Sequence, residues 1–280
     1  MNITPIEIDI NEWECFGGGF MAESFYKKDD DHIMLKLYAP SVPGVEVYDE
    51  LCISEKISKL GLPIAVPVSY AKSGDRYGAV FERIKNKRSI ARIIADEPER
   101  VDEMGKLFAD MLKMLHSTEC DTKLFPDMQA LCLKEVLQSP FITETQRSKA
   151  VYFLSSLPKN TGCVHGDCHL GNIVINKEQG PIFIDLADFS YGNPLFDLGT
   201  SYFMAQLIPD EMCFNLFHVH LDVMNDFWQS VVKYYFPGER LEDVNESLKP
   251  FAGFRAVHLA SKSVKSDAVL ERVFVQAFGE

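Results

Sequence analysis

The sequence predicts an α+β protein of two lobes, an N-terminal lobe built on an antiparallel sheet with one helix and a larger, mainly helical C-terminal lobe. Up to residue 84, short apolar runs alternate with turn signals, which is typical of β-strands. Beyond Lys85, apolar residues recur at helical spacing. The 280 residues are 46% hydrophobic, enough for a buried core in such a unit. We therefore expect lobes at 1–84 and 85–280.

The N-terminal lobe divides into strands and one helix at glycine, proline and acidic turn signals. Gly17-Gly18-Gly19 breaks the first apolar run, and Asp29-Asp30-Asp31 reverses the chain after the second. Pro43-Gly44 precedes a helical stretch that Gly61 and Pro63 end. The expected strands are 6–16, 24–27, 33–38, 66–71 and 76–84, and the expected helix is 45–60.

The C-terminal lobe begins with a strongly periodic helix. Apolar residues between Glu99 and Ser117 repeat at about 3.6 residues, which predicts a core helix. Thr143-x-x-Gln146 is a capping-box signature for a helix that runs to Leu157 and stops at Pro158. The last eighty residues are helical and aromatic-rich in pattern.

The most informative segment is Val164-His165-Gly166-Asp167-Cys168-His169-Leu170-Gly171-Asn172. It is followed by two apolar runs, 173–175 and 182–184, with a turn between them and Asp185 after the second. The two runs predict a hairpin that delivers Asp167, Asn172 and Asp185 to one end of the sheet. One carboxylate can orient a hydroxyl, and an amide and a second carboxylate can hold Mg²⁺. Phosphoryl transfer requires this combination.

The pattern His-Gly-Asp-x-His-x-x-Asn, followed by Ile-Asp-x-x-Asp, resembles the aminoglycoside phosphotransferase and choline kinase family, the small-molecule relatives of the protein kinases. Gly192-x-Pro194-x-x-Asp197 resembles a further motif of this family. The resemblance implies a protein-kinase-like fold and an ATP-dependent kinase that uses Mg²⁺. It also implies a small-molecule hydroxyl as the phosphate acceptor, such as that of an aminoglycoside, an amino sugar or a choline-like metabolite.

The resemblance implies roles for the acidic and amide residues of this segment. Asp167 would be the catalytic base, or at least orient the acceptor hydroxyl, and Asn172 and Asp185 would bind Mg²⁺. Asp188 is the second choice for the metal and could instead orient the loop or face the substrate. Asp197 would cap a helix or bond to the catalytic-loop backbone.

In the N-terminal lobe, the resemblance implies that Lys36 contacts the α- and β-phosphates and is held by an acid of the following helix. We expect this acid to be Glu50, because it shares a helix face with Val47 and Ile57 and there needs a partner. The alternative for Lys36 is a solvent-facing side chain on an amphipathic edge strand.

The remaining nucleotide contacts are expected from backbone. Gly17-x-Gly19-x-x-Ala22 would be a loop that covers the phosphates, although a glycine cluster can also be an ordinary hairpin turn. The family's hinge would place the backbone of Glu82 to Ile84 against the adenine edge. A protein-kinase loop would favour Gly at Ala22 and Val at Ser24, so the chain departs from that pattern in this loop.

The histidines are expected to be structural. His165 would set the turn geometry through a backbone hydrogen bond, His169 is similar, and His116 would be a packed or capping residue. A metal or structural cluster of His165, Asp167, Cys168 and His169 is the alternative explanation of the segment. His218 and His220 diverge on a helix, so that pair predicts no metal site.

Composition excludes several classes of function. A net charge of −13 argues against nucleic acid or an anionic membrane surface as a partner and is compatible with a cationic substrate. Seven cysteines without a Cys-x-x-Cys pair indicate reduced thiols. Neither a signal peptide nor an apolar run of about 20 residues is found, so a cytoplasmic protein is expected.

Three rival functions remain open at this point: a nucleotide-binding pseudokinase, a protein kinase and a metal-dependent hydrolase. A pseudokinase would not need all four residues of the expected catalytic set, but the sequence contains them all: Lys36, Asp167, Asn172 and Asp185. The second calls for a peptide-docking element, which is not visible. The hydrolase would need histidine ligands and would leave the glycine cluster unexplained. The acceptor and the oligomeric state stay open.

Overall fold

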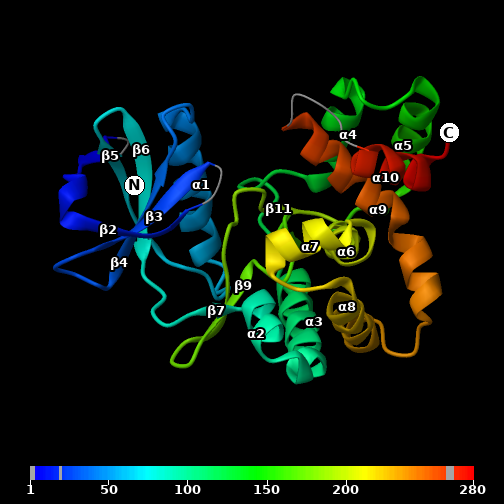
Figure 1. Ribbon diagram of the computed structural model, residues 1–280. Coiled ribbons are helices and arrows are strands. Elements are labelled where there is room, and N and C mark those ends of the chain that lie inside the picture. Colours follow the sequence, from blue (N-terminus) through cyan, green and yellow to red (C-terminus); the bar gives the residue numbers. More distant parts are fainter. Residues whose placement is uncertain (1–3, 19–20, 263–267) are drawn as a thin grey trace. The chain divides into compact units, whose positions relative to one another are not determined.

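The computed structural model describes residues 4–18, 21–262 and 268–280. The chain forms two compact units (Figure 1). The first comprises the residues up to Lys87 together with Val174–Ala187, and the second comprises Arg88–Ile173 and Asp188–Glu280. The first is a sheet with a helix and the second is mainly helical, which confirms the predicted α+β class.

A six-stranded sheet organises the first unit, in the order β1-β5-β6-β4-β3-β2. Its strands are β1 (Ile6–Glu7), β2 (Trp13–Gly18), β3 (Ala22–Lys27), β4 (Ile33–Tyr38), β5 (Pro67–Ser73) and β6 (Arg76–Glu82). β1 runs parallel to β5, and the other pairs are antiparallel. Helix α1 (Gly44–Ser58) packs on β5 and β6. β4, which carries Lys36, therefore lies inside the sheet and not at its edge.

The expected first strand, 6–16, is wrong as a single element. Residues Ile10–Glu12 form a 3₁₀ helix that separates β1 from β2, and the Asp9 carboxylate caps it by accepting the Asn11 N–H. β2 instead continues through Gly17 and Gly18, with a bulge between Cys15 and Gly17. Gly17 and Gly18 thus pair with β3, and the glycine cluster does not break the strand at its first residue.

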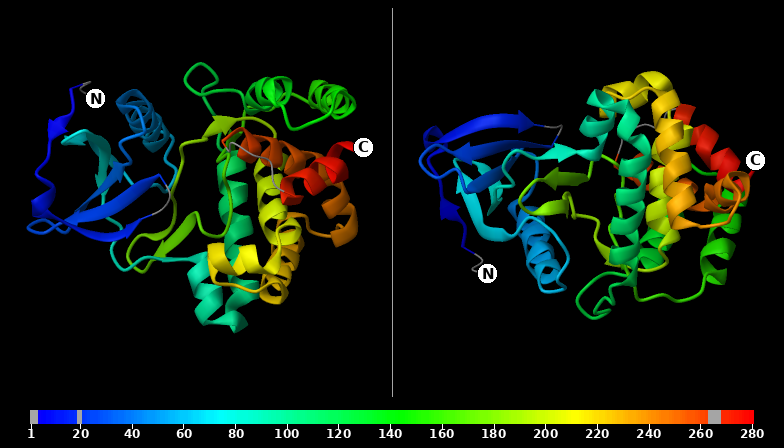
Figure 2. Two further views of the ribbon diagram at one scale, coloured as in Figure 1. Left: turned by 45° about the horizontal axis from the view of Figure 1, so that its top comes forward. Right: turned by 90° about the horizontal axis from the view of Figure 1, so that it is seen from below.

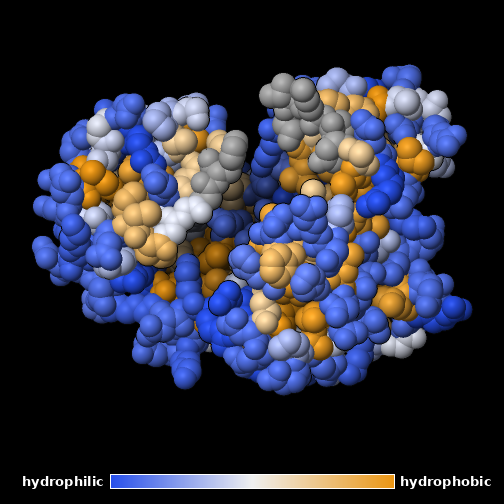
Figure 3. All heavy atoms as spheres, viewed as in Figure 1, coloured by the Kyte–Doolittle hydropathy of each residue, from blue (hydrophilic) through white to orange (hydrophobic). Residues whose placement is uncertain are grey.

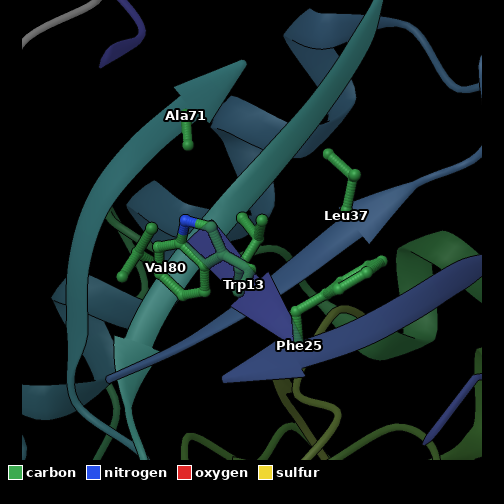
Figure 4. Packing of buried hydrophobic residues seen from close by; sticks show 6 residues of the cluster. Trp13, Phe25, Leu37, Ala71 and Val80 are labelled. Carbon is green, nitrogen blue, oxygen red and sulfur yellow. The ribbon is translucent and has the colours of Figure 1, made fainter. Parts of the chain in front are cut away.

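Strand alternation sorts the side chains of β4 onto two faces. Leu35 and Leu37 belong to a buried cluster with Trp13, Phe25, Ala71 and Val80. These residues come from strands β2 to β6, and their side chains gather on one face of the sheet (Figure 4). Tyr38 faces the opposite side, in a second cluster with Val47 and Leu51 of α1. Because successive strand residues alternate faces, Lys36 lies on the α1 side with Tyr38.

The hairpin of β9 (Ile173–Asn176) and β10 (Gly180–Phe183) packs against the sheet unit. Val174 and Ile182 form a buried cluster with Ile84. The Phe183 N–H donates to the Pro63 carbonyl at 2.8 Å, and the Asn176 side chain donates to the Lys85 carbonyl. Three separate stretches of sequence therefore share one small core.

In its described part, the second unit is built from helices and three two-residue strands. The helices are α2 (Ile90–Asp96), α3 (Val101–Ser117), α4 (Met128–Gln138), α5 (Glu144–Ser156), α6 (Leu195–Tyr202), α7 (Asp210–Phe217), α8 (Leu221–Tyr235), α9 (Leu241–Ser261) and α10 (Ala268–Phe278). The strands are β7 (Arg88–Ser89), β8 (Cys163–Val164) and β11 (Ser190–Tyr191), of which β8 and β11 pair antiparallel.

Two pairings of long helices form the core of this unit. α3 packs along α8, and α9 packs on α6 and α10 (Figure 2). The close approach of α6 to α9 depends on Gly199, since a Cβ there would run into Phe251. The capping box predicted at Thr143 and Gln146 is present at the start of α5. Helices α2 and α4 were not expected from the sequence.

Polar side chains cover much of the visible surface of both units (Figure 3). Hydrophobic residues gather there in small patches, while Trp228 and Phe254 are among the largest fully buried side chains. Among the described residues, no helix is both long enough and apolar enough to span a membrane.

Candidate active site

The first unit holds a cavity of about 570 Å³. Its walls come from the end of β2, from β3, β4 and α1, from the residues after β6 and from the end of the β9–β10 hairpin. Apolar side chains, among them Ala22, Met34 and Ile184, line much of it. The charged side chains that line it are Lys36, Glu50, Lys87 and Asp185.

Lys36 lies between two carboxylates. Its ammonium Nζ is 3.0 Å from Glu50 Oε1 and 2.9 Å from Asp185 Oδ1. The hydroxyl of Tyr38, the next residue on the same face of β4, donates to Glu50 Oε2. The predicted partnership of Lys36 with Glu50 is therefore present, and the solvent-facing alternative for Lys36 is not. Each end of the Glu50 carboxylate is used to hold this arrangement.

Electrostatics keeps Lys36 charged. Burial disfavours the ammonium, but the charges of Asp185 and Glu50 outweigh burial and raise the pKa of Lys36 above its usual value. The cavity thus carries a fixed positive charge at its wall. An anionic ligand, for example a phosphate chain, would meet a cation that needs no change of protonation state.

Asp185 adopts an unusual backbone conformation. Its φ is +57°, in the left-handed region, which non-glycine residues occupy at a cost and which Asp and Asn tolerate best. The strand β10 ends at Phe183, so Asp185 lies two residues beyond it and not directly at its end as expected. Its side chain is about half exposed, with a relative accessibility of 54%, and lines the cavity. Local strain of this kind is concentrated at functional sites.

The backbone contacts expected for a nucleotide are brought to the cavity only in part. Gly17 and Ile84 line it, whereas Gly19 lies outside the described residues. Glu82 does not line the cavity, and its N–H already donates to the Val66 carbonyl at 2.9 Å. Of the expected hinge, Ile84 is therefore the residue in place to meet a ligand.

Lys87 is a cavity residue that sequence reasoning missed. Burial lowers the pKa of its ammonium, and the charge of Asp185 offsets this effect only in part. It follows the expected hinge by three residues in a run, Lys85-Asn86-Lys87-Arg88, that reads as an ordinary polar turn. The sequence signal that could have identified Lys87 was its basic side chain close to the expected hinge.

The second unit contains the loop that follows β8. Asp197, in the first turn of α6, is fully buried and accepts the backbone N–H groups of His165 at 2.7 Å and Gly166 at 2.8 Å. His116 lies 3.1 Å from the same carboxylate. The predicted bond from Asp197 to the loop backbone is confirmed, and His116 is a packed residue as expected.

Histidine rings hold the two turns of this loop. The Asp167 N–H donates to His165 Nδ1 at 3.3 Å, and the Gly171 N–H donates to His169 Nδ1 at 3.1 Å. The structural role predicted for His165 is confirmed. His169 has a structural role too, and its Nε2 also lies 3.8 Å from Asp167 Oδ1.

Asn172 is buried and tied to the same loop. Its side-chain Nδ2 donates to the Asp167 carbonyl at 2.9 Å, so the amide oxygen is the side-chain atom that does not take part in this bond. Its backbone N–H donates to the His169 carbonyl at 2.9 Å. Asp167 and Asn172 are therefore joined by hydrogen bonds within one loop, while Asp185 belongs to the other unit.

Asp167 pairs with an arginine that sequence reasoning missed. Arg255 Nη2, from α9, lies 2.5 Å from Asp167 Oδ1. Asp188 is drawn into the same network, 3.3 Å from His258 Nε2 and 3.4 Å from Lys262 Nζ. The sequence signal for Arg255 was that it is the single charged residue in the apolar stretch Phe251–Val257. All seven residues of this stretch are buried.

Among the described residues, no group of three or more His, Cys, Asp or Glu is arranged to hold a metal ion. His218 ends α7 with a positive φ of +57°, and His220 Nδ1 lies 3.0 Å from Asp210. These two histidines thus have separate local roles.

The fold of the chain is similar to the folds of several solved small-molecule kinases. The amicoumacin kinase hAmiN, in complex with AMP-PNP, Ca²⁺ and Ami, is 15% identical over 98% of this chain and 90% of its own, with a TM-score of 0.58. The ADP-bound aminoglycoside phosphotransferase APH(2'')-Ib is 18% identical over 96% and 94%, with a TM-score of 0.61. APH(2")-IIa, in a ternary complex with streptomycin and ATP, is 17% identical over 96% and 92%, with a TM-score of 0.60.

At these identities the likeness establishes the fold, and it confirms the predicted protein-kinase-like fold class. No curated protein matches the sequence. The sequence pattern of the phosphotransferase enzyme family, however, matches residues 12–213, more than half of the chain. This match includes the cavity lining around Lys36 and the loop from His165 to Asn172, and on it the chain belongs to the phosphotransferase enzyme family.

Proposed function

We propose that this phosphotransferase moves the γ-phosphate of ATP to a hydroxyl group of a small molecule. The observation that carries the proposal is the charged Lys36, held by Glu50 and Asp185 in the wall of a cavity of about 570 Å³. A cavity of this size suits a nucleotide-sized ligand. We propose the sheet unit, expected at 1–84 and extended by the segment Val174–Ala187, as the nucleotide-covering lobe. We propose the mainly helical unit, expected within 85–280, as the catalytic and acceptor-binding lobe.

The cavity wall divides by chemistry in a way that suits ATP. Its apolar part, with Ala22, Met34 and Ile84, would contact adenine, and the Ile84 backbone would supply the hinge contact. Lys36 would bind the α- and β-phosphates. Gly17 adds no side chain there, and a Cβ built on it would meet no atom within 4 Å, so backbone and phosphate could approach closely.

The residues present fit a magnesium ion by the chemistry of their donors. Asn172 offers an amide oxygen and Asp185 a carboxylate, and Mg²⁺ prefers oxygen ligands of this kind. We propose these two residues as its protein ligands. When bound, the ion would neutralise charge on the phosphate oxygens.

Asp167 would act on the acceptor. Its carboxylate would accept the hydrogen bond of the acceptor hydroxyl and take its proton as the acceptor oxygen bonds to the γ-phosphorus. The bond from the γ-phosphorus to the bridging oxygen breaks, and ADP leaves. The fixed charge of Lys36 stabilises the negative charge on the phosphates during transfer.

We infer a cationic acceptor with a free hydroxyl group, such as an aminoglycoside, an amino sugar or a choline-like metabolite. The structures of similar fold include enzymes bound to amicoumacin-type and streptomycin ligands. The net charge of −13 also favours encounter with cations over anions.

Thermal unfolding with and without ATP and Mg²⁺ tests the nucleotide site. Ligand at a hundred times its dissociation constant adds about 2.7 kcal/mol, which raises the midpoint by roughly 5–10 °C in a chain of this size. Asp185→Asn is the best variant, because Asn tolerates the left-handed conformation that Asp185 adopts. We expect it to lose the magnesium-dependent part of the shift. The absence of any shift in the wild-type protein with every nucleotide would contradict the proposal.

Asp167→Asn tests the chemical step. We expect phosphate transfer to fall by at least about 100-fold, the range typical of a lost general base, with Mg-ATP affinity within twofold of wild type. The measurement is transfer of labelled phosphate to a panel of amino sugars and aminoglycosides. Strong residual turnover would refute the role of Asp167. Wild-type binding of ATP without transfer to any hydroxyl would favour a pseudokinase, and transfer to peptides alone would favour a protein kinase.

A further inference from the structure

Arg255 is a buried cation beside the loop of Asp167. Its side chain is only 7% exposed, and it lies in α9 within the seven buried residues Phe251–Val257. Removing a guanidinium from water is unfavourable, so a buried arginine needs close partners. The partners of Arg255 are Gly166 and Asp167 of the loop and the nearby Asp188.

The contacts of Arg255 converge on two acids. Nη2 lies 2.5 Å from Asp167 Oδ1, and Nη1 lies 3.4 Å from the Gly166 carbonyl and 3.7 Å from Asp188 Oδ2. Its Nε has no hydrogen-bond partner among the described residues. The strongest contact by far is therefore the one to Asp167, and the guanidinium holds that side chain through one oxygen.

A face of α9 supports this contact. Arg255, His258 and Lys262 follow one another at spacings of three and four residues, so they share one side of the helix. His258 Nδ1 is 2.7 Å from Glu135 of α4, and His258 and Lys262 both contact Asp188. Asp188 thus connects the cationic face of α9 to the loop that carries Asp167.

This arrangement distinguishes the two oxygens of Asp167. Oδ1 pairs with Arg255 and lies 3.8 Å from His169 Nε2. Within the described part of the second unit, Oδ2 has neither a hydrogen bond nor an ion pair. Resting on the proposed function, we propose that Arg255 is a positioning residue for Asp167, which fixes the carboxylate through Oδ1 and presents Oδ2 to the acceptor hydroxyl.

The chemistry gives this contact a purpose beyond stability. A base that must meet a hydroxyl within hydrogen-bond distance loses about 100-fold in rate when it is displaced by about 1 Å. The hydrogen bonds of the Asp167 N–H and carbonyl fix only its main chain. The guanidinium supplies the missing constraint on the side chain, and Asp188 and His258 hold the guanidinium's neighbourhood in turn.

Two variants of Arg255 test the proposal by kinetics and binding together. For Arg255→Met we expect kcat to fall by about 100-fold with ATP affinity within twofold of wild type, because the ATP cavity is formed by the other unit. Arg255→Lys keeps the charge but not the planar fork, so we expect it to recover about tenfold of the loss. The nucleotide-dependent thermal shift shows that each variant is folded.

Arg147 provides the matched control. It is another largely buried arginine of the same unit, but its guanidinium binds the carbonyls of Val136 and Ser139 at the end of α4. We expect Arg147→Met to lower the unfolding midpoint and to leave kcat unchanged. A folded Arg255→Met with wild-type kcat would overturn the positioning role alone. A wild-type protein that transfers phosphate to no acceptor would overturn the proposed function and this inference with it.

Discussion

Lysines at two neighbouring positions, 85 and 87, meet different surroundings. Lys85 Nζ forms an exposed ion pair with Asp31 at 2.6 Å. Lys87 lines the cavity, and burial lowers the pKa of its ammonium. Within the described part of the first unit, Lys87 has neither a hydrogen bond nor a close ion pair. An ammonium in this position favours an anionic ligand, so Lys87 is the second cation that a phosphate chain would meet.

Lys87→Met is expected to weaken ATP binding by about tenfold, or about 1.4 kcal/mol, while adenosine affinity stays unchanged. The loss should shrink from ATP to ADP to AMP as phosphates are removed. Titration calorimetry with this nucleotide series is the measurement. Lys85→Met is the matched control and should bind every nucleotide as wild type does. Equal losses for adenosine and ATP would show that Lys87 supports the cavity wall and not the phosphates.

At the level of single residues, the sequence predicted contacts that follow from a strong local motif. Lys36 with Glu50, and Asp197 with the backbone of His165, are present as expected. Arg255 escaped prediction because its partner Asp167 is far away in sequence, and helical periodicity assigns only a face and not a tertiary partner. The roles of these residues in catalysis stay predictions.

The loop from His165 to Asn172 is the element on which the proposed chemistry depends. Gly166 has a φ of +85°, and a Cβ there would run into the carbonyl oxygen of Asp188. Its N–H is held by Asp197. The loop therefore needs glycine for two reasons, the left-handed backbone and the close approach of the chain segment at Asp188.

Gly166→Ala should displace this loop and reduce kcat by about 100-fold or more, with a loss of about 1–3 kcal/mol in the free energy of unfolding. The variant Gly238→Ala separates the effect of the left-handed backbone from the effect of the close approach of the chain at Asp188. Gly238 has a similar φ of +89° in the same unit, but a Cβ there meets no atom within 4 Å. We expect it to lose stability from backbone strain alone and to keep kcat. Steady-state kinetics and urea denaturation measure both effects. A Gly166→Ala enzyme with normal kcat would show that the loop tolerates the shift.

Secondary structure was predictable where a pattern was long. Helix α3 and the capping box of α5 follow their sequence signals within two residues. The first strand was mispredicted, because the Asp9 side chain ends it locally through a turn that apolar alternation does not reveal. Short helices such as α2 carry too few periodic positions to be distinguished from a loop.

At the scale of the whole molecule, the chain returns to its first unit after leaving it. The sequence suggests a single change of composition near Lys85, whereas Val174–Ala187 packs with residues up to Lys87. Ile84 with Val174 and Ile182 makes this connection. An apolar strand looks the same in sequence whichever core it joins, so the partner of such a hairpin cannot be deduced from its own residues.

The charge network of α9 links the stability of the molecule to pH. Burial lowers the pKa of His258, but the carboxylates of Asp188 and Glu135 outweigh burial and raise that pKa above its usual value of about 6.5. A group whose folded pKa is raised contributes stability that is fully present below its unfolded pKa. That contribution is lost as pH rises through the folded pKa. We therefore expect the protein to become less stable as the pH rises above about 6.5.

Asp188 adds the opposite dependence at acid pH. Burial raises the pKa of its carboxyl, but His258, Lys262 and Arg255 together hold it well below the usual range. Its contribution to stability is thus complete above the unfolded pKa of about 3.9 and is lost as pH falls below that value. Between these two limits, near pH 4 to 6.5, Asp188 and His258 are both charged.

The variant His258→Gln tests the expected loss of stability as the pH rises above about 6.5. Glutamine retains a donor for one carboxylate but carries no charge, so the variant should lose about 1.5–3 kcal/mol at pH 6, the range for hydrogen bonds to charged groups. The difference from wild type should shrink steadily toward pH 9, because the wild-type ring loses its proton over that interval. Urea denaturation at unit pH steps measures this difference. His220→Gln is the control, since His220 pairs with Asp210 on an exposed surface, where ion pairs contribute little. A constant difference between wild type and His258→Gln from pH 6 to 9 would show that packing, and not the charge of His258, holds α9 against Asp188.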